Sequence, residues 1–105
     1  MRATAWSNGS PTHSGAGYAL KVSEVDRDRY FSHSWTEVTV DLPDGTSAPI
    51  RLSESFWRHC SELRSAAVGR WLMNARLAPW PRGEPPGLTL MPVAGNRFQL
   101  TAAGR

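Results

Sequence analysis

Two clusters of polar side chains have the composition of a surface that reads nucleic-acid bases. The first contains Asn8, Ser10, His13 and Ser14, and the second contains Arg58, His59, Ser61 and Arg64. An Arg guanidinium can bond both acceptors of a guanine edge, an Asn amide can pair with adenine, and Ser and His can bond bases or phosphates. Both clusters fall outside the long periodic segments, where recognition residues tend to lie. We therefore treat these eight residues as candidate DNA contacts.

The basic residues favour the same chemistry. Eleven of the twelve are arginine and only Lys21 is lysine, and the net charge is +3. Arg forms planar, bidentate bonds to guanine edges and to phosphates, so an Arg-rich chain suits an anionic partner. A GC-rich genome would also produce this excess, together with the many Ala, Gly and Pro residues, and this second explanation stays open.

The sequence lacks several common motifs for catalysis and for cofactor binding. The sequence has no C-x-x-C, H-E-x-x-H or G-x-S-x-G pattern. His59 and Cys60 are adjacent, so in a strand they would point to opposite faces. Lys21 lacks the acid two residues before it that many metal-dependent nucleases carry. We expect a protein that is not an enzyme, with no catalytic residues, no metal and no cofactor.

Length and cysteine content predict one cytoplasmic domain. The 105 residues suit a single domain over 1–105, and we expect residues 1–5 and 102–105 to fray. A lone cysteine forbids an intramolecular disulfide, which favours a reducing compartment. No apolar run is long enough to span a membrane, and no signal peptide is visible. We therefore expect no membrane association.

Hydrophobic periodicity predicts short strands and two helices. Alternating patterns predict strands at 18–22, 36–42, 47–52, 87–91 and 97–101, with a further strand around 3–7. Ser23 is a good N-cap for a helix through Phe31, whose expected core residues are Val25, Tyr30 and Phe31. A second helix at 66–77 has the apolar stripe Val68, Trp71, Leu72 and Ala75.

Segment 54–65 decides between two fold classes. Ser65 is a good N-cap for a helix that starts at Ala66, which favours a loop and a strand over 54–65. The chain is then mainly β, an open seven-stranded pseudobarrel with two helices. The alternative places Phe56, Cys60 and Leu63 on one helical stripe. That gives an α+β fold, with an antiparallel sheet packed on one long helix at 54–77.

The order of these elements resembles the DNA-binding pseudobarrel superfamily, which includes plant B-three transcription-factor domains and effector domains of type II restriction enzymes. The resemblance covers residues 17–100 and rests on the segments ALKVSEVDRDRYF, TEVTVDLPDGTSAPIRL and SFWRHCSELRSAAVGRWLMNARL, with GLTL and RFQL as the last two strands. It implies a non-catalytic domain that grips the major groove of double-stranded DNA with two polar arms. By position, these arms are residues 6–18 and 55–64. As an exposed contact, Arg64 should be replaceable by Ala with little loss of thermal stability.

The segment PWPRGEPPG at 79–87 departs from the family pattern, which has a short Gly-Asp link after the helix. An exposed Trp beside Pro residues is a good anchor for a protein partner. The alternative function is therefore a protein-interaction module of a restriction, toxin or phage-defence system. Its expected contact is Trp80.

Overall fold

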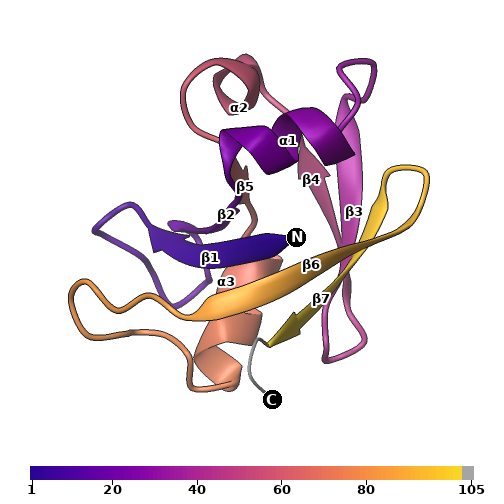
Figure 1. Cartoon of the computed structure of the whole chain (residues 1–105). Coiled ribbons are helices and arrows are strands. Elements are labelled where there is room, and N and C mark those ends of the chain that lie inside the picture. Colours follow the sequence, from indigo (N-terminus) through magenta and orange to yellow (C-terminus); the bar gives the residue numbers. More distant parts are fainter. Residues whose placement is uncertain (103–105) are drawn as a thin grey trace.

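The computed structural model describes residues 1–102. These residues form seven strands and three short helices, joined by loops (Figure 1). The strands are β1 (Arg2–Ser7), β2 (Tyr18–Lys21), β3 (Glu37–Asp41), β4 (Ser47–Arg51), β5 (Glu62–Arg64), β6 (Gly87–Ala94) and β7 (Arg97–Ala102). The helices are α1 (Glu24–Tyr30), α2 (Glu54–Arg58) and α3 (Ala66–Asn74). The strands thus dominate the fold, as the alternating pattern predicted.

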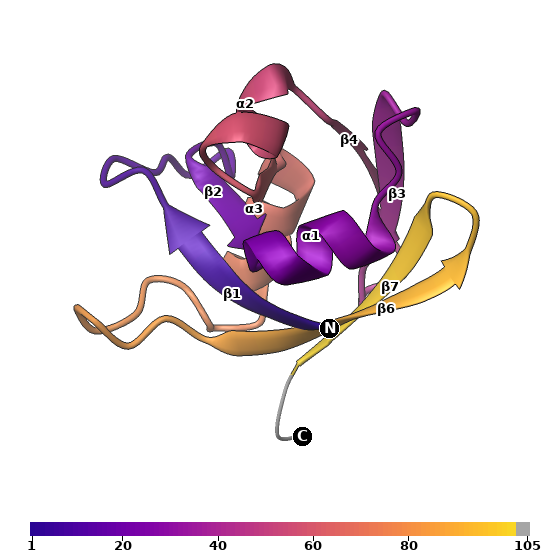
Figure 2. The ribbon, with the colours of Figure 1, turned by 45° about the horizontal axis from the view of Figure 1, so that its top comes forward.

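The strands form one strongly curved mixed sheet. Its order is β4-β3-β7-β6-β1-β2-β5, and every pair is antiparallel except β3 and β7, which run parallel. The sheet curls until its two edge strands, β4 and β5, approach each other (Figures 1 and 2). The result is a nearly closed barrel, which confirms the predicted mainly-β pseudobarrel.

The core fills the inside of this barrel. Buried positions alternate with more exposed ones along β1, β3, β4 and β7, and Leu20, Leu63 and Phe98 are fully buried. Aromatic rings occupy one end, where Phe31 stacks on Phe98 with ring centroids 4.8 Å apart and meets Phe56 at 5.2 Å. In Figure 1, α1 and α2 lie over this end and α3 lies towards the opposite end.

Helix α1 is capped as predicted, but its core residues differ. The Ser23 hydroxyl accepts a hydrogen bond from the Asp26 backbone N–H at 3.1 Å. Phe31 is buried, whereas Val25 is 75% exposed, so its prediction as a core residue is wrong. Arg27 is buried in its place and donates to the Phe56 carbonyl at 3.2 Å. Positions two apart on a helix lie about 200° apart, so the helix cannot bury both 25 and 27.

Segment 54–65 is not one continuous helix, so the long-helix alternative is wrong. Helix α2 ends at Arg58, β5 follows at 62–64, and α3 starts after Ser65. The Ser65 hydroxyl accepts from the Val68 N–H at 3.3 Å, which makes Ser65 the N-cap that the sequence indicated. The short α2 was not predicted. Helix α3 is also shorter than predicted, since it ends at Asn74 and leaves Ala75 exposed.

The N-terminus is part of the sheet, which contradicts the expected fraying of residues 1–5. Strand β1 pairs with both β2 and β6, and the Met1 ammonium donates to the Leu90 carbonyl at 2.9 Å. At the other end, Ala102 closes β7, and residues 103–105 lie outside the described residues. Within residues 1–102, no helix is long and apolar enough to cross a membrane.

An ion pair joins the parallel strands β3 and β7. Asp41 accepts two hydrogen bonds from Arg97, both at 2.7 Å, and one from the Ser47 hydroxyl at 2.7 Å. The bonds from Arg97, and then the bond from Ser47, lower the pKa of the Asp41 carboxyl below its ordinary value.

This lowered pKa predicts a pH-dependent contribution to stability. A carboxyl with a depressed pKa in the folded state stabilises the protein above its unfolded pKa, which is about 3.9 for Asp. That stabilisation is lost as the pH falls through the folded pKa. We expect Asp41→Asn to be less stable than the parent protein at pH 6, with the difference shrinking below about pH 4. Urea unfolding followed by Trp fluorescence across pH 2–7 measures it, and a constant difference down to pH 2 would contradict the prediction.

Candidate nucleic-acid interface

The first polar cluster lies on the loop between β1 and β2, residues 8–17, which we call the β1–β2 arm. Asn8, Ser10, His13 and Ser14 are all exposed. The base of the arm is closed by a hydrogen bond from the Asn8 N–H to the Gly17 carbonyl at 2.9 Å. Inside it, the Asn8 Oδ1 accepts from the Ser10 N–H at 2.8 Å, and the Ser14 and Thr12 hydroxyls are bonded at 2.7 Å. These bonds give the arm a defined shape.

The arm is also held against helix α3. Gly15 is buried and its backbone contacts the backbone of α3 at Ala66, Gly69 and Arg70. A Cβ on Gly69 would lie 2.8 Å from the carbonyl carbon and from the Cα of Gly15, so glycine is required at this contact. The Arg70 Nη1 donates to the Ser14 carbonyl at 2.9 Å. The arm is therefore supported by the scaffold and does not hang free.

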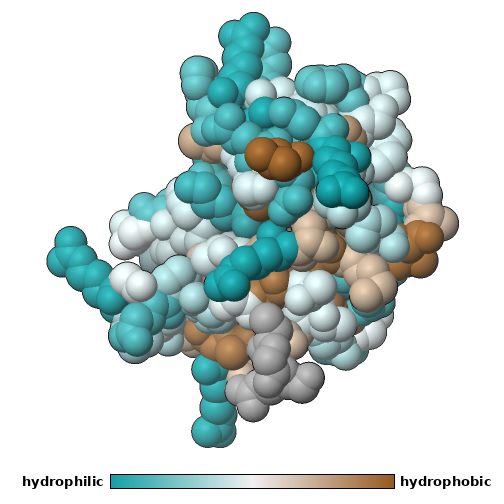
Figure 3. Space-filling view, viewed as in Figure 1, coloured by the Kyte–Doolittle hydropathy of each residue, from teal (hydrophilic) through white to brown (hydrophobic). Residues whose placement is uncertain are grey.

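The second polar cluster is divided by the structure. Arg58 and His59 are exposed at the end of α2. In Figure 3 the region of α1 and α2 is mostly hydrophilic, with one hydrophobic patch over α1. Ser61 is buried, and its hydroxyl donates to the Val22 carbonyl. The prediction that Ser61 contacts DNA is therefore corrected, because its side chain is buried and hydrogen-bonded within the protein. We call residues 58–61 the α2–β5 connector.

Arg64 lies on β5, at the far end of this strand from the connector. Strands β2 and β5 are antiparallel, with Ala19 opposite Arg64 and Lys21 opposite Glu62. The β1–β2 arm leads into the start of β2 and so lies beside Arg64, whereas the connector leads into β5 beside Lys21. Three residues of strand, about 10 Å, separate these two ends. The two arms therefore lie at opposite ends of β2 and β5, with the strands between them.

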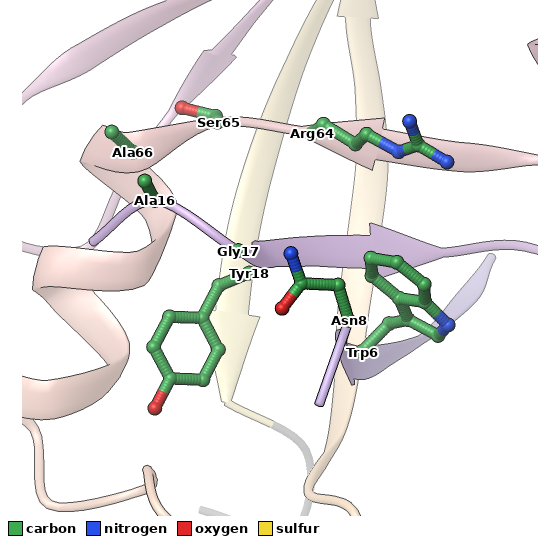
Figure 4. A pocket seen from close by; sticks show the side chains of 8 residues that line it. All are labelled: Trp6, Asn8, Ala16, Gly17, Tyr18, Arg64, Ser65 and Ala66. Atoms are coloured by element: carbon green, nitrogen blue, oxygen red, sulfur yellow. The ribbon is translucent and has the colours of Figure 1, made fainter. Parts of the chain in front are cut away.

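The outer face of β1, β2 and β5 joins the two arms. Because residues directly opposite each other in a sheet share a face, the rows Trp6–Ala19–Arg64 and Thr4–Lys21–Glu62 point away from the core. Two hollows lie on this face. One has a volume of about 400 Å³ and is lined by Arg2, Thr4, Lys21, Val22, Ser23 and Asp26. The other, of about 380 Å³, is lined by residues of β1, β2, β5 and α3 (Figure 4).

Sequence reasoning missed Arg2 and Lys21 as members of this surface. Both are exposed, and both lie on the outward positions of their strands. The alternation of β2 places Tyr18 and Leu20 on the inward face and Lys21 on the outward face. The sequence alone could therefore have shown that Lys21 points outward. What the sequence did not contain was the pairing of β2 with β5, which brings Lys21 and Arg64 onto one face.

Arg64 is held by two neighbours. Its guanidinium lies over the indole of Trp6, 5.5 Å from the ring centroid, and its Nη2 donates to Glu62 Oε1 at 3.1 Å. The Arg64 side chain is 60% exposed, but that of Glu62 is only 5% exposed. Arg64 is thus presented to solvent in a fixed orientation. Because Arg64 is also the partner of the buried Glu62, it has a structural role that the sequence did not predict.

Trp80, the expected contact of the alternative function, is half-buried. Its ring packs against Tyr18 with centroids 5.8 Å apart, and both residues line a shallow hollow with Ser7, Pro11 and Pro79. Part of the Trp80 indole is therefore buried against residues of the protein itself. Among residues 1–102, no group of three or more His, Cys, Asp or Glu side chains is placed to hold a metal ion.

Comparison of the chain with protein-family models, with curated proteins and with solved structures gave no match. The assignment of this surface therefore depends on its own geometry and charge.

Proposed function

We propose that the chain is a non-catalytic double-stranded DNA-binding domain of the pseudobarrel type. It reads the major groove with the β1–β2 arm and the α2–β5 connector. The observation that carries the proposal is the position of the two arms, which project from opposite ends of β2 and β5 and flank a face that bears Arg2, Lys21 and Arg64. The single free cysteine, Cys60, fits a cytoplasmic location beside DNA.

The dimensions support this arrangement. The B-DNA major groove is about 12 Å wide, and the ends of β2 are about 10 Å apart, so side chains from the two arms can enter one groove together. Ser10 and His13 on one arm, and Arg58 and His59 on the other, supply the hydrogen-bonding groups that base edges require, while Asn8 contacts DNA from the base of the first arm. The cations between the arms then face the phosphates. Two carboxylates also lie at this face: Glu62, which is buried and paired with Arg64, and Asp26, which lines the hollow with Arg2 and Lys21.

The proposal predicts affinity that falls steeply with salt. Among the described residues, the exposed cations Arg2, Lys21 and Arg64 lie on this face, and Arg58 is exposed at the start of the connector. At about 0.9 per neutralised phosphate, the slope of log affinity against log salt should be about −3 to −4. Fluorescence anisotropy of a labelled 20-base-pair duplex between 50 and 300 mM NaCl measures it. Arg58→Ala should reduce the slope by about one, whereas Arg76→Gln, at the far end of α3, should leave it unchanged.

The proposed function would be wrong if the protein did not bind duplex DNA at 50 mM salt and protein concentrations of tens of micromolar. It would also be wrong if the affinity were independent of salt, since the phosphate contacts would then be absent.

A further inference from the structure

A concave site lies beside Trp6 on the outer face. It has a volume of about 380 Å³ and is lined by Trp6, Asn8, Ala16, Gly17, Tyr18, Arg64, Ser65 and Ala66. Figure 4 shows these residues converging from the base of the β1–β2 arm, from β5 and from the start of α3. The volume lies within the range of about 300–1,000 Å³ typical of small-ligand pockets.

The charged group at this hollow is the Arg64 guanidinium, and its orientation is fixed. Among residues 1–102, Arg64 is the only charged residue that lines it, and no carboxylate does. The guanidinium of Arg64 has five N–H donors, of which one nitrogen, Nη2, bonds Glu62. The contact with Trp6 and the bond to the buried Glu62 hold the guanidinium in place. An anion in the hollow would meet a cation that is already oriented.

The amide of Asn8 adds a second oriented donor. The Ser10 N–H is a donor, so the Asn8 atom that lies 2.8 Å from it is the acceptor, Oδ1. The amide nitrogen must then point the other way, and Figure 4 shows it directed towards the space between Gly17 and Arg64. The position of Asn8 in the turn thus fixes which of its two polar atoms faces the hollow.

Two acceptor oxygens beside the hollow are already engaged within the protein. The Asn8 Oδ1 is engaged by Ser10, and the Ser65 hydroxyl oxygen accepts from Val68. The first turn of α3, which also borders the hollow, contains no acidic residue. A nucleobase edge carries donors as well as acceptors, and its donors would find few partners here, which is unfavourable. A group that only accepts hydrogen bonds fits better.

We propose that this hollow, which we call the Arg64 hollow, binds a phosphate group through the Arg64 guanidinium and the Asn8 amide nitrogen. The inference rests on the proposed function, in which the phosphate belongs to the DNA backbone next to the β1–β2 arm. Charge-assisted bonds from Arg to phosphate are among the strongest hydrogen bonds in proteins. A phosphate held here fixes the position of the arm relative to the groove, because Asn8 is itself the first residue of the arm.

Inorganic phosphate tests the hollow without DNA. Amide and indole ¹H–¹⁵N resonances are followed during titration with sodium phosphate, and with sodium acetate at matched ionic strength. We expect saturable shifts at millimolar phosphate for the Trp6 indole N–H and the Ala66 amide, and at least a tenfold weaker response to acetate. Absence of a saturable shift, or an equal response to acetate, would overturn the proposal.

Asn8→Asp is the sharpest variant for this test. The carboxylate keeps an oxygen that accepts from the Ser10 N–H, so the turn is retained, but it replaces the amide donor by a negative charge. We expect phosphate binding to weaken at least tenfold, with the melting temperature little changed. Arg64→Gln combined with Glu62→Gln removes the cation without leaving a buried carboxylate unpaired, and it should abolish binding. Arg76→Gln is the matched control and should bind phosphate like the parent protein. Unchanged binding in Asn8→Asp would contradict the assignment.

Duplex binding distinguishes the two proposals. If Asn8→Asp lowers the salt slope for duplex DNA by about one, the bound phosphate belongs to the DNA backbone. If duplex DNA binds with an unchanged slope, DNA does not use the hollow, and this inference fails while the proposed function stands. If phosphate saturates the hollow but no duplex binds, the proposed function fails and the hollow is a site for a free phosphate-bearing ligand.

Discussion

We expect Gly69→Ala to destabilise the protein by about 3 kcal/mol, although alanine is the better helix former. In the interior of a helix, Gly→Ala normally stabilises by about 1 kcal/mol. Here the new Cβ would overlap the carbonyl group of Gly15, because the backbones of α3 and the β1–β2 arm are in direct contact. Overpacking of this kind costs about 1–3 kcal/mol, and more where backbone must move. A loss of stability in Gly69→Ala, in place of the usual gain, would therefore show that α3 and the β1–β2 arm are in contact.

Urea unfolding of the parent and the variant, followed by Trp fluorescence, measures this change. Gly45→Ala is the control for left-handed strain, because Gly45 has a φ of +90° and no atom within 4 Å of the added Cβ. That substitution should cost only about 1–2 kcal/mol. Gly69→Ala has no such strain, so a loss larger than that of Gly45→Ala must come from the clash. A neutral or stabilising Gly69→Ala would show that the arm does not pack on α3.

The same substitution links the arm to the proposed function. If the arm leaves α3 to relieve the overlap, the bond from Arg70 to the Ser14 carbonyl is also lost. Asn8, Ser10 and His13 would then have to be ordered on binding, which costs about 1–2 kcal/mol of conformational entropy per fixed residue. Duplex affinity should fall at least tenfold under conditions where Gly69→Ala is still folded.

Local sequence signals predicted most of the scaffold. Alternation located the strands that begin at Tyr18 and Ser47, and the caps Ser23 and Ser65 marked the starts of α1 and α3. These features depend on residues close together in the chain. The short α2 was missed because a helix of five residues has too few positions to show a period. Val25 was misplaced because the pattern of a seven-residue helix cannot show that its inward face carries Arg27.

The candidate site was less predictable, because its geometry depends on strand pairing. The sequence identified Asn8, His13 and Arg58 as exposed polar groups, and they are exposed. It could not show that Ser61 faces inward to bond the Val22 carbonyl, since that contact joins residues 39 positions apart. Nor could it show that Arg64 meets Trp6, which follows from the pairing of β1, β2 and β5. Polar composition indicated which residues are exposed, whereas the strand register determines which of them share a face.

The pair formed by Glu62 and Arg64 changes the expected effect of a substitution at Arg64. The sequence favoured an exposed contact that could be replaced without loss of stability. In the structure, Arg64→Ala leaves the Glu62 carboxylate, which is only 5% exposed, without its hydrogen-bond donor. A buried acceptor that loses its partner costs about 1–3 kcal/mol. We therefore expect Arg64→Ala to destabilise the protein by about 2 kcal/mol.

Glu62→Gln should rescue most of this loss. In the double variant Arg64→Ala with Glu62→Gln the buried group is neutral, so its desolvation costs much less. Urea unfolding of the parent, both single variants and the double variant gives a coupling free energy, which we expect to exceed 1 kcal/mol. Strictly additive effects would show that the two side chains are not paired. Because the double variant should fold normally yet lack the Arg64 cation, any loss of duplex affinity in it reports the contact of Arg64 with DNA and not a loss of folded protein.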